Sequence, residues 1–70
     1  MKAIVYVGFD RKKHLIVCDD YKIDYEDKDI YFLKDDERFC VRFLGVVITT
    51  ENYNDEQKIV FEEFLKGELI

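Results

Sequence analysis

Acidic side chains concentrate between residues 19 and 37, where the segment YKIDYEDKDIY occupies residues 21–31. Nine acids and three lysines give residues 19–37 a net charge of −6, whereas residues 1–18 carry +3 and residues 38–70 carry −2. Carboxylates and tyrosines at this density suggest three kinds of chemistry. They could bind a metal ion, imitate the phosphate backbone of a nucleic acid, or contact a protein partner.

The acidic segment lacks the spacing of a metal site. An EF-hand loop places oxygen ligands at its first, third and fifth positions and glycine at its sixth. Counting from Asp24, the fifth and sixth positions are Lys28 and Asp29. The two cysteines and the single histidine are scattered, without the paired spacing of a zinc site, and the three glycines are isolated. We therefore predict no metal ion and no other cofactor.

The charge pattern of this segment fits a solvated strand edge, and a protein contact is its functional alternative. Asp24 and Glu26 would lie about 6.6 Å apart on one side of a strand, which is compatible with a phosphate mimic. Lysines at 22, 28 and 34 interrupt the acids, as is typical of an edge protected against self-pairing. Tyrosine favours a protein contact. The predicted partner-binding residues are Asp24, Glu26, Asp27, Asp29, Tyr31, Asp35, Asp36 and Glu37.

Nucleophilic catalysis has little support in the sequence. Serine is absent, and His14 is the only histidine. Cys18 would lie roughly 13 Å from His14 along one strand, and Cys40 stands in the apolar stretch FCVRF, where a buried thiol is inert. We expect both cysteines to be buried, reduced thiols. We predict no catalytic residue and no enzymatic activity.

The basic turn Arg11–Lys13 is the feature that favours nucleic acid. Tyr6 and Phe9 supply aromatic neighbours of the kind that single-strand binders use, and two further arginines, Arg38 and Arg42, would extend the patch. The whole chain carries a net charge of −5, which opposes binding to a polyanion. A solvated hairpin tip is the simpler interpretation, and nucleic-acid binding is the weakest of our hypotheses.

Short strands are predicted to position these residues. We expect strands at Lys2–Gly8, His14–Cys18, residues 21–26, Asp29–Lys34 and Arg38–Thr50, with a bulge or break at Gly45. The first run is apolar on both faces, which is typical of a central strand covered on two sides. Alternation in the third run directs Lys22, Asp24 and Glu26 to water, and Tyr21, Ile23 and Tyr25 to the core.

The C-terminal part of the chain changes to helical periodicity. Its apolar stripe consists of Val60, Phe61, Phe64 and Leu65. Asn54 is a suitable N-cap and Gly67 a suitable stop, which predicts a helix over Asp55–Lys66. The expected fold is α+β, an antiparallel β-meander of four to six strands with one C-terminal amphipathic helix packed on the sheet. We expect residues 1–70 to form a single compact domain.

These patterns predict a small, acidic, non-enzymatic protein-binding module. The chain has no apolar run long enough to span a membrane and no recognisable signal peptide, which favours the cytoplasm. Its scarcity of Ala, Pro and Arg is typical of AT-rich genomes, such as those of many firmicutes and their phages. An adaptor or inhibitor of a host protein, of the anti-defence type that phages and prophages encode, fits these features. The partner would be a host or self protein surface, with a basic surface as one candidate. The alternative is a structural or regulatory homodimer that uses a sheet edge or a helix face.

Overall fold

The computed structural model describes residues 1–67 and contains six strands followed by one helix. In chain order the elements are β1 (Lys2–Val7), β2 (Lys13–Cys18), β3 (Asp20–Asp24), β4 (Asp29–Lys34), β5 (Glu37–Arg42), β6 (Gly45–Thr50) and α1 (Asp55–Lys66). This order confirms the predicted α+β fold, with a β-meander and a C-terminal helix. The helix has the bounds that the sequence predicts.

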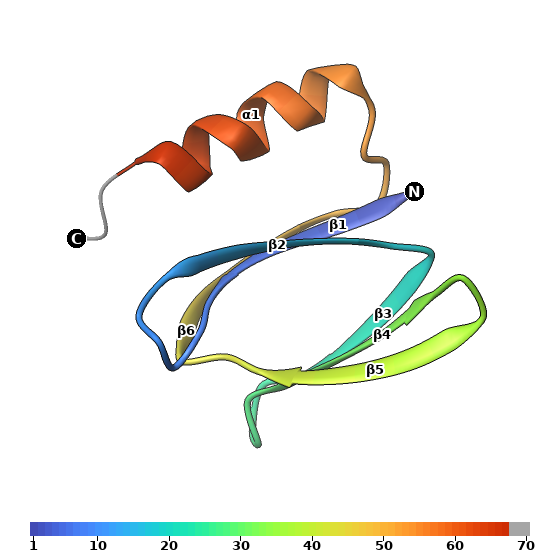
Figure 1. Ribbon diagram of the computed structural model, residues 1–70, viewed down its shortest axis with the longest axis vertical. Coiled ribbons are helices and arrows are strands. Elements are labelled where there is room, and N and C mark those ends of the chain that lie inside the picture. The colour runs from blue at the N-terminus through green and yellow to red at the C-terminus, as the bar shows by residue number, and fades with distance from the viewer. Residues whose placement is uncertain (68–70) are drawn as a thin grey trace.

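The strands divide into two antiparallel three-stranded sheets instead of a single sheet. Sheet A has the strand order β2-β1-β6, and sheet B has the order β3-β4-β5. Figure 1 shows three layers, with α1 over one face of sheet A and sheet B against the other face. The helix therefore packs on sheet A, while among the described elements nothing covers the outer face of sheet B.

The chain passes from one sheet to the other at two corners, first between β2 and β3 and then between β5 and β6. These two passages place β3, β4 and β5 in a sheet of their own. Asp19 separates β2 from β3, and its backbone amide donates a hydrogen bond to the carbonyl of Leu33 in β4 at 2.8 Å. Phe43 and Leu44 separate β5 from β6, and the Leu44 amide donates to the Val7 carbonyl at 2.7 Å. Each corner is thus hydrogen-bonded to the central strand of one sheet.

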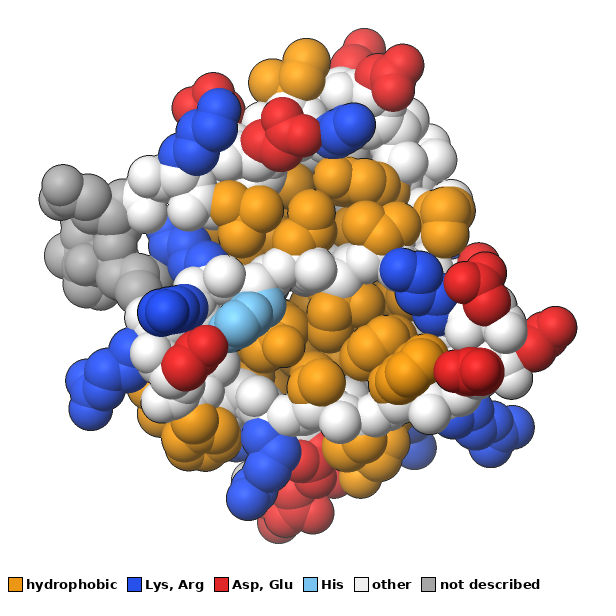
Figure 2. All heavy atoms as spheres, viewed as in Figure 1, with side chains coloured by type: hydrophobic (Ala, Val, Ile, Leu, Met, Phe, Trp, Pro, Cys, Tyr) orange, Lys and Arg blue, Asp and Glu red, His pale blue; other side chains and the backbone are white. Residues whose placement is uncertain are grey.

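Strand β1 is buried on both faces, which confirms the prediction for Lys2–Gly8. Ala3 and Val5 pack with Phe61 of the helix, whereas Ile4 packs with Ile30 of sheet B. Figure 2 shows the resulting apolar layers from the side, with hydrophobic side chains gathered between α1 and sheet A and again between the two sheets. Burial of apolar surface in two layers stabilises a chain of this length.

Helix α1 begins after Asn54 because this side chain caps it. The Asn54 Oδ1 accepts a hydrogen bond from the Gln57 amide at 3.0 Å. Phe61 anchors the helix to sheet A and has 3% of its surface exposed, whereas Phe64 is only half-buried. Val60 is 57% exposed. Its assignment to the buried stripe is wrong, because the helix contacts the sheet along a narrower line centred on Phe61.

The predicted interruption at Gly45 is present, and a β-bulge accompanies it. The pairing of β1 with β6 shifts register between Tyr6 and Val7, which leaves Val46 as the extra residue. The φ angle of Val46 is 51°, a left-handed conformation that is rare for a β-branched side chain. Regular pairing of β6 with β1 covers Val47–Thr50.

Candidate protein-binding surface

The outer face of sheet B presents three rows of side chains, each with one residue from every strand of the sheet. We call these residues the Tyr31 face; the register aligns Asp24, Asp29 and Arg42, then Lys22, Tyr31 and Cys40, then Asp20, Leu33 and Arg38. Successive residues of a strand point to opposite faces, and the intervening side chains, such as Ile23 and Ile30, lie in the core. The Tyr31 face thus carries three acids and three bases, so its charge is balanced.

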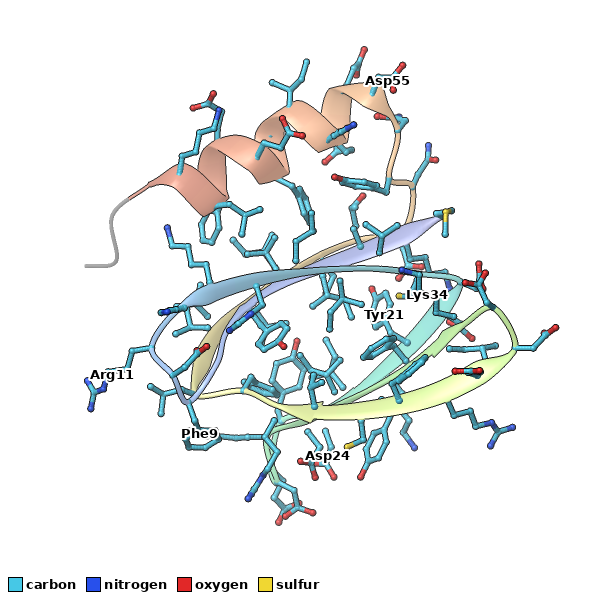
Figure 3. The ribbon with its side chains drawn as sticks, viewed as in Figure 1. Phe9, Arg11, Tyr21, Asp24, Lys34 and Asp55 are labelled. Carbon is cyan, nitrogen blue, oxygen red and sulfur yellow. The ribbon has the colours of Figure 1, made fainter. Side chains whose placement is uncertain are left out.

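The eight predicted partner-binding residues fall into separate groups. Asp24, Asp29 and Tyr31 belong to the Tyr31 face. Figure 3 shows Asp24 on the side of sheet B that is turned away from sheet A. These three residues are therefore available together on one surface.

The other five predicted residues lie at opposite ends of strand β4. Glu26 and Asp27 form part of the β3–β4 turn, whereas Asp35 and Asp36 form the β4–β5 turn. Glu37 begins β5 opposite Lys34 and is exposed. Strand β4 separates the two turns by roughly 17 Å. The acids therefore do not form one continuous negative surface.

Asp24 and Asp29, two of the acids on the Tyr31 face, make contacts that stabilise sheet B and its β3–β4 turn. The Asp24 Oδ1 accepts hydrogen bonds from the amides of Glu26 and Asp27, both at 3.1 Å, which stabilises the β3–β4 turn. The Asp29 side chain is 19% exposed, and its Oδ1 lies 3.4 Å from the Nε of Arg42. Asp24 and Asp29 thus contribute to the structure of sheet B.

Tyr31 lies at the centre of this face and is 45% exposed. The negative charge of Asp29 is the main cause that raises the pKa of its hydroxyl group. At neutral pH the hydroxyl is therefore protonated, so it can both donate and accept a hydrogen bond. An aromatic ring with a polar tip is suited to an interface that contains water.

An open depression of about 800 Å³ lies along sheet B. Residues of all three strands line it, including Lys22, Tyr31, Leu33, Arg38 and Phe39. Phe39 is 41% exposed, and its ring stacks on that of Phe32 with a centroid distance of 5.0 Å. Sheet B therefore offers apolar and aromatic surface together with both signs of charge.

Two predictions about sheet B are wrong. Tyr25 was expected in the core, but it is 65% exposed, because β3 ends at Asp24 and Tyr25 belongs to the following turn. Cys40 was expected to be buried, but it is exposed. The alternation of β5 directs Phe39 and Val41 toward the core side and Cys40 to the Tyr31 face. Cys18 is buried, as predicted.

A polar cluster that the sequence does not predict lies at the corner of the two sheets. The Lys2 Nζ lies 2.9 Å from the Asp20 Oδ1 and 3.2 Å from the Glu51 Oε2. The Tyr21 hydroxyl donates to the Glu51 Oε1 at 2.6 Å, and Figure 3 shows Tyr21 between the two sheets. We call these four residues the corner cluster. Nothing in the spacing of its members indicates that they meet, because they come from three distant segments.

The basic turn is smaller than the sequence suggests, because the helix engages one of its lysines. The Lys13 Nζ donates to the carbonyls of Phe64 and Gly67, at 2.7 and 2.6 Å. Arg42 stacks over Phe9 of the turn at 5.8 Å, whereas Arg38 lies at the other end of β5. Arg11 projects from the tip of the turn (Figure 3).

His14 belongs to the β1–β2 hairpin, not to the Tyr31 face. Its Nε2 lies 2.9 Å from the Asp10 Oδ2, and its ring stacks on Tyr6. The hydrogen bond to His14 is the main cause that lowers the pKa of Asp10.

Within residues 1–67, no three His, Cys, Asp or Glu side chains are grouped as ligands of one metal ion. In the same part of the chain, no helix is long and apolar enough to cross a membrane.

Comparison with known proteins gives no relative: no family model, curated protein or solved structure matches the chain.

Proposed function

We propose that this protein is a non-enzymatic protein-binding module whose partner docks on the Tyr31 face. The observation that carries the proposal is the contrast between the two sheets. Sheet A is covered by α1 on one face and by sheet B on the other, whereas the outer face of sheet B lies open among the described residues (Figure 1). At the centre of that open face stands the half-exposed ring of Tyr31.

The chemistry of this face favours a partner of mixed charge. Leu33 and Tyr31 offer apolar surface in the middle, and Lys22 and Arg38 offer cations around it. Interfaces commonly combine an aromatic anchor with a polar rim. Because this face carries three acids and three bases, a purely basic or purely acidic partner would meet repulsion from half of its charges. A small adaptor or inhibitor that blocks a protein surface is a role consistent with one such face on a chain of 70 residues.

A comparison of matched variants tests this proposal. The immobilised protein would recover its partner from a lysate of the cells that produce it, and the purified complex would then be measured by calorimetry. Tyr31→Ala should weaken binding at least tenfold, since central aromatic anchors contribute a large share of binding free energy. Ile59→Ala is the matched control, because Ile59 is also an exposed apolar residue, at 64%, but belongs to α1. All variants need unchanged melting curves.

Cys40 provides an independent test of whether the partner covers the Tyr31 face. Its exposed thiol stands next to Tyr31 in the register, whereas Cys18 is buried. Alkylation of Cys40 should slow when the partner is bound, because the partner would cover this row. Equal alkylation rates with and without partner, together with full binding by Tyr31→Ala, would show that the partner docks elsewhere. Steep loss of affinity with rising salt would instead favour the acidic turns as the contact.

A further inference from the structure

Strand β6 forms an edge of sheet A that has no neighbour among the described residues. It pairs with β1 alone, so the backbone groups along its other side are unpaired within residues 1–67. Two of its apolar side chains are exposed, Val46 at 56% and Ile48 at 36%. A free edge of this kind is a template for pairing with another strand.

The sequence of β6 differs from that of the other edge strands in its lack of charge. β3 reads DYKID and β5 reads ERFCVR, and β2 begins with the charged residue Lys13. These charges protect an edge because a paired strand would desolvate or repel them. β6 reads GVVITT, and no charged residue occurs anywhere in 43–50. Within residues 1–67, β6 is thus the edge strand that carries no charged residue.

We infer that a second copy of this chain pairs with β6, edge to edge and antiparallel, to form a two-fold symmetric dimer. Two copies of a protein with a net charge of −5 repel each other over most of their surfaces. The uncharged edge is where they can approach with least repulsion. An antiparallel pair of identical strands also satisfies two-fold symmetry, since the same edge serves both copies.

The bulge at Val46 limits where this pairing can occur. The left-handed backbone of Val46 interrupts the regular strand, which leaves Val47–Thr50 for the new ladder. The two-fold axis therefore falls near Ile48 and Thr49. Ile48 lies opposite Val5 on the helix side of sheet A, so the Ile48 side chains of the two copies would meet across the axis and lose exposed area. The joined sheet would have the order β2-β1-β6-β6-β1-β2.

This dimer goes beyond the proposed binding function, because it would make the module bivalent. The pairing edge belongs to sheet A, whereas the Tyr31 face points away from sheet A. Both Tyr31 faces would stay accessible. Two linked sites gain avidity for a partner that is itself repeated or dimeric.

Analytical ultracentrifugation of matched variants tests the inference. The wild-type protein should sediment at about twice 8.5 kDa at high micromolar concentration. Ile48→Lys and Thr49→Lys should each shift the protein to the monomer, because like charges would face each other across the axis. Ile59→Lys is the control with the same change of side chain, since Ile59 is 64% exposed on α1. It should leave the dimer intact.

Hydrogen exchange gives a second measurement that does not depend on any variant. As protein concentration rises, those amides of residues 47–50 that point away from β1 should become protected, while those at the charged edge of β5 should not change. A monomer at every concentration would overturn the inference. A dimer that survives both lysine variants with no added protection in β6 would also overturn it, because the interface would then lie elsewhere. Neither result bears on the Tyr31 face, which is tested separately.

Discussion

Lys2 and Lys13 both use their charges inside the fold, across long separations in sequence. Lys13 caps the end of α1 by donating to two carbonyls, which suits a cation at a helix C-terminus. Lys2 joins β1 to the corner between β2 and β3 and to Glu51 after β6. Nucleic-acid binding loses support as a result, because only Arg11 and Lys12 of the basic turn project freely from the described structure.

The corner cluster makes stability depend on pH at the acidic end. Its hydrogen bonds lower the pKa of Asp20, mainly through Lys2, and of Glu51, mainly through Tyr21 and then Lys2. A carboxyl group whose pKa is lower in the folded state stabilises the fold above its ordinary pKa. That stabilisation is lost as the pH falls through the folded value. The ordinary values are 3.8 for Asp20 and 4.5 for Glu51, so the loss begins below about pH 4.5.

Glu51→Gln should therefore lower the melting temperature near neutral pH, and the difference from wild type should shrink as the pH falls below about 4.5. Thermal melts across this range check the prediction, with Glu26→Gln as control, because Glu26 is an exposed acid in the β3–β4 turn. A constant difference between wild type and Glu51→Gln at all pH values would show that the ionic contacts of Glu51 do not contribute. All members of the cluster are partly exposed, so the effect should shrink in high salt.

At the scale of elements, Phe61 is the only buried side chain of α1 within residues 1–67 and contributes most to its attachment to sheet A. Phe61→Ala should destabilise the fold by roughly 3–5 kcal/mol, because it leaves a cavity between α1 and β1. Phe64→Ala should cost clearly less, since its ring is half-buried and covered by the Lys13 ammonium group at 4.7 Å. Urea denaturation measures both. Phe61→Leu, which keeps most of the volume, should fall between wild type and Phe61→Ala. Equal costs at the two positions would show that Phe61 is not the main contact between α1 and sheet A.

Elements whose signals are local were predictable from the sequence, and contacts between distant segments were not. The Asn54 cap and the charge pattern around it determine where α1 begins, and the apolar run of β1 indicates burial on both faces. The division into two sheets depends on the Asp19–Leu33 and Leu44–Val7 hydrogen bonds, which no short-range pattern reveals. Because β3 ends at Asp24, two residues earlier than expected, Tyr25 lies in the turn and not in the core. The grouping of Asp24, Asp29 and Tyr31 follows from alternation, whereas the presence of Arg38, Cys40 and Arg42 beside them depends on the pairing of β5.

For the molecule as a whole, the reactivity of the two cysteines distinguishes the native surface from separation of the two sheets. Cys18 has none of its surface exposed and packs in the core between the two sheets, and burial raises the pKa of its thiol. Cys40 stands exposed on the Tyr31 face. Because the thiolate is the reactive form, Cys40 should react at once with a thiol reagent, and Cys18 only when the sheets separate.

Labelling with a chromogenic disulfide should therefore proceed in two phases of equal amplitude. Cys40→Ala should remove the fast phase and leave the slow phase unchanged. In Phe61→Ala the logarithm of the slow-phase rate should rise in proportion to the loss of stability, because labelling through a fully opened state follows the equilibrium constant of unfolding when closing is fast. If both thiols react quickly in the native protein, the two sheets separate without global unfolding. The layers would then be independent, and sheet B could change its distance from sheet A when a partner binds the Tyr31 face.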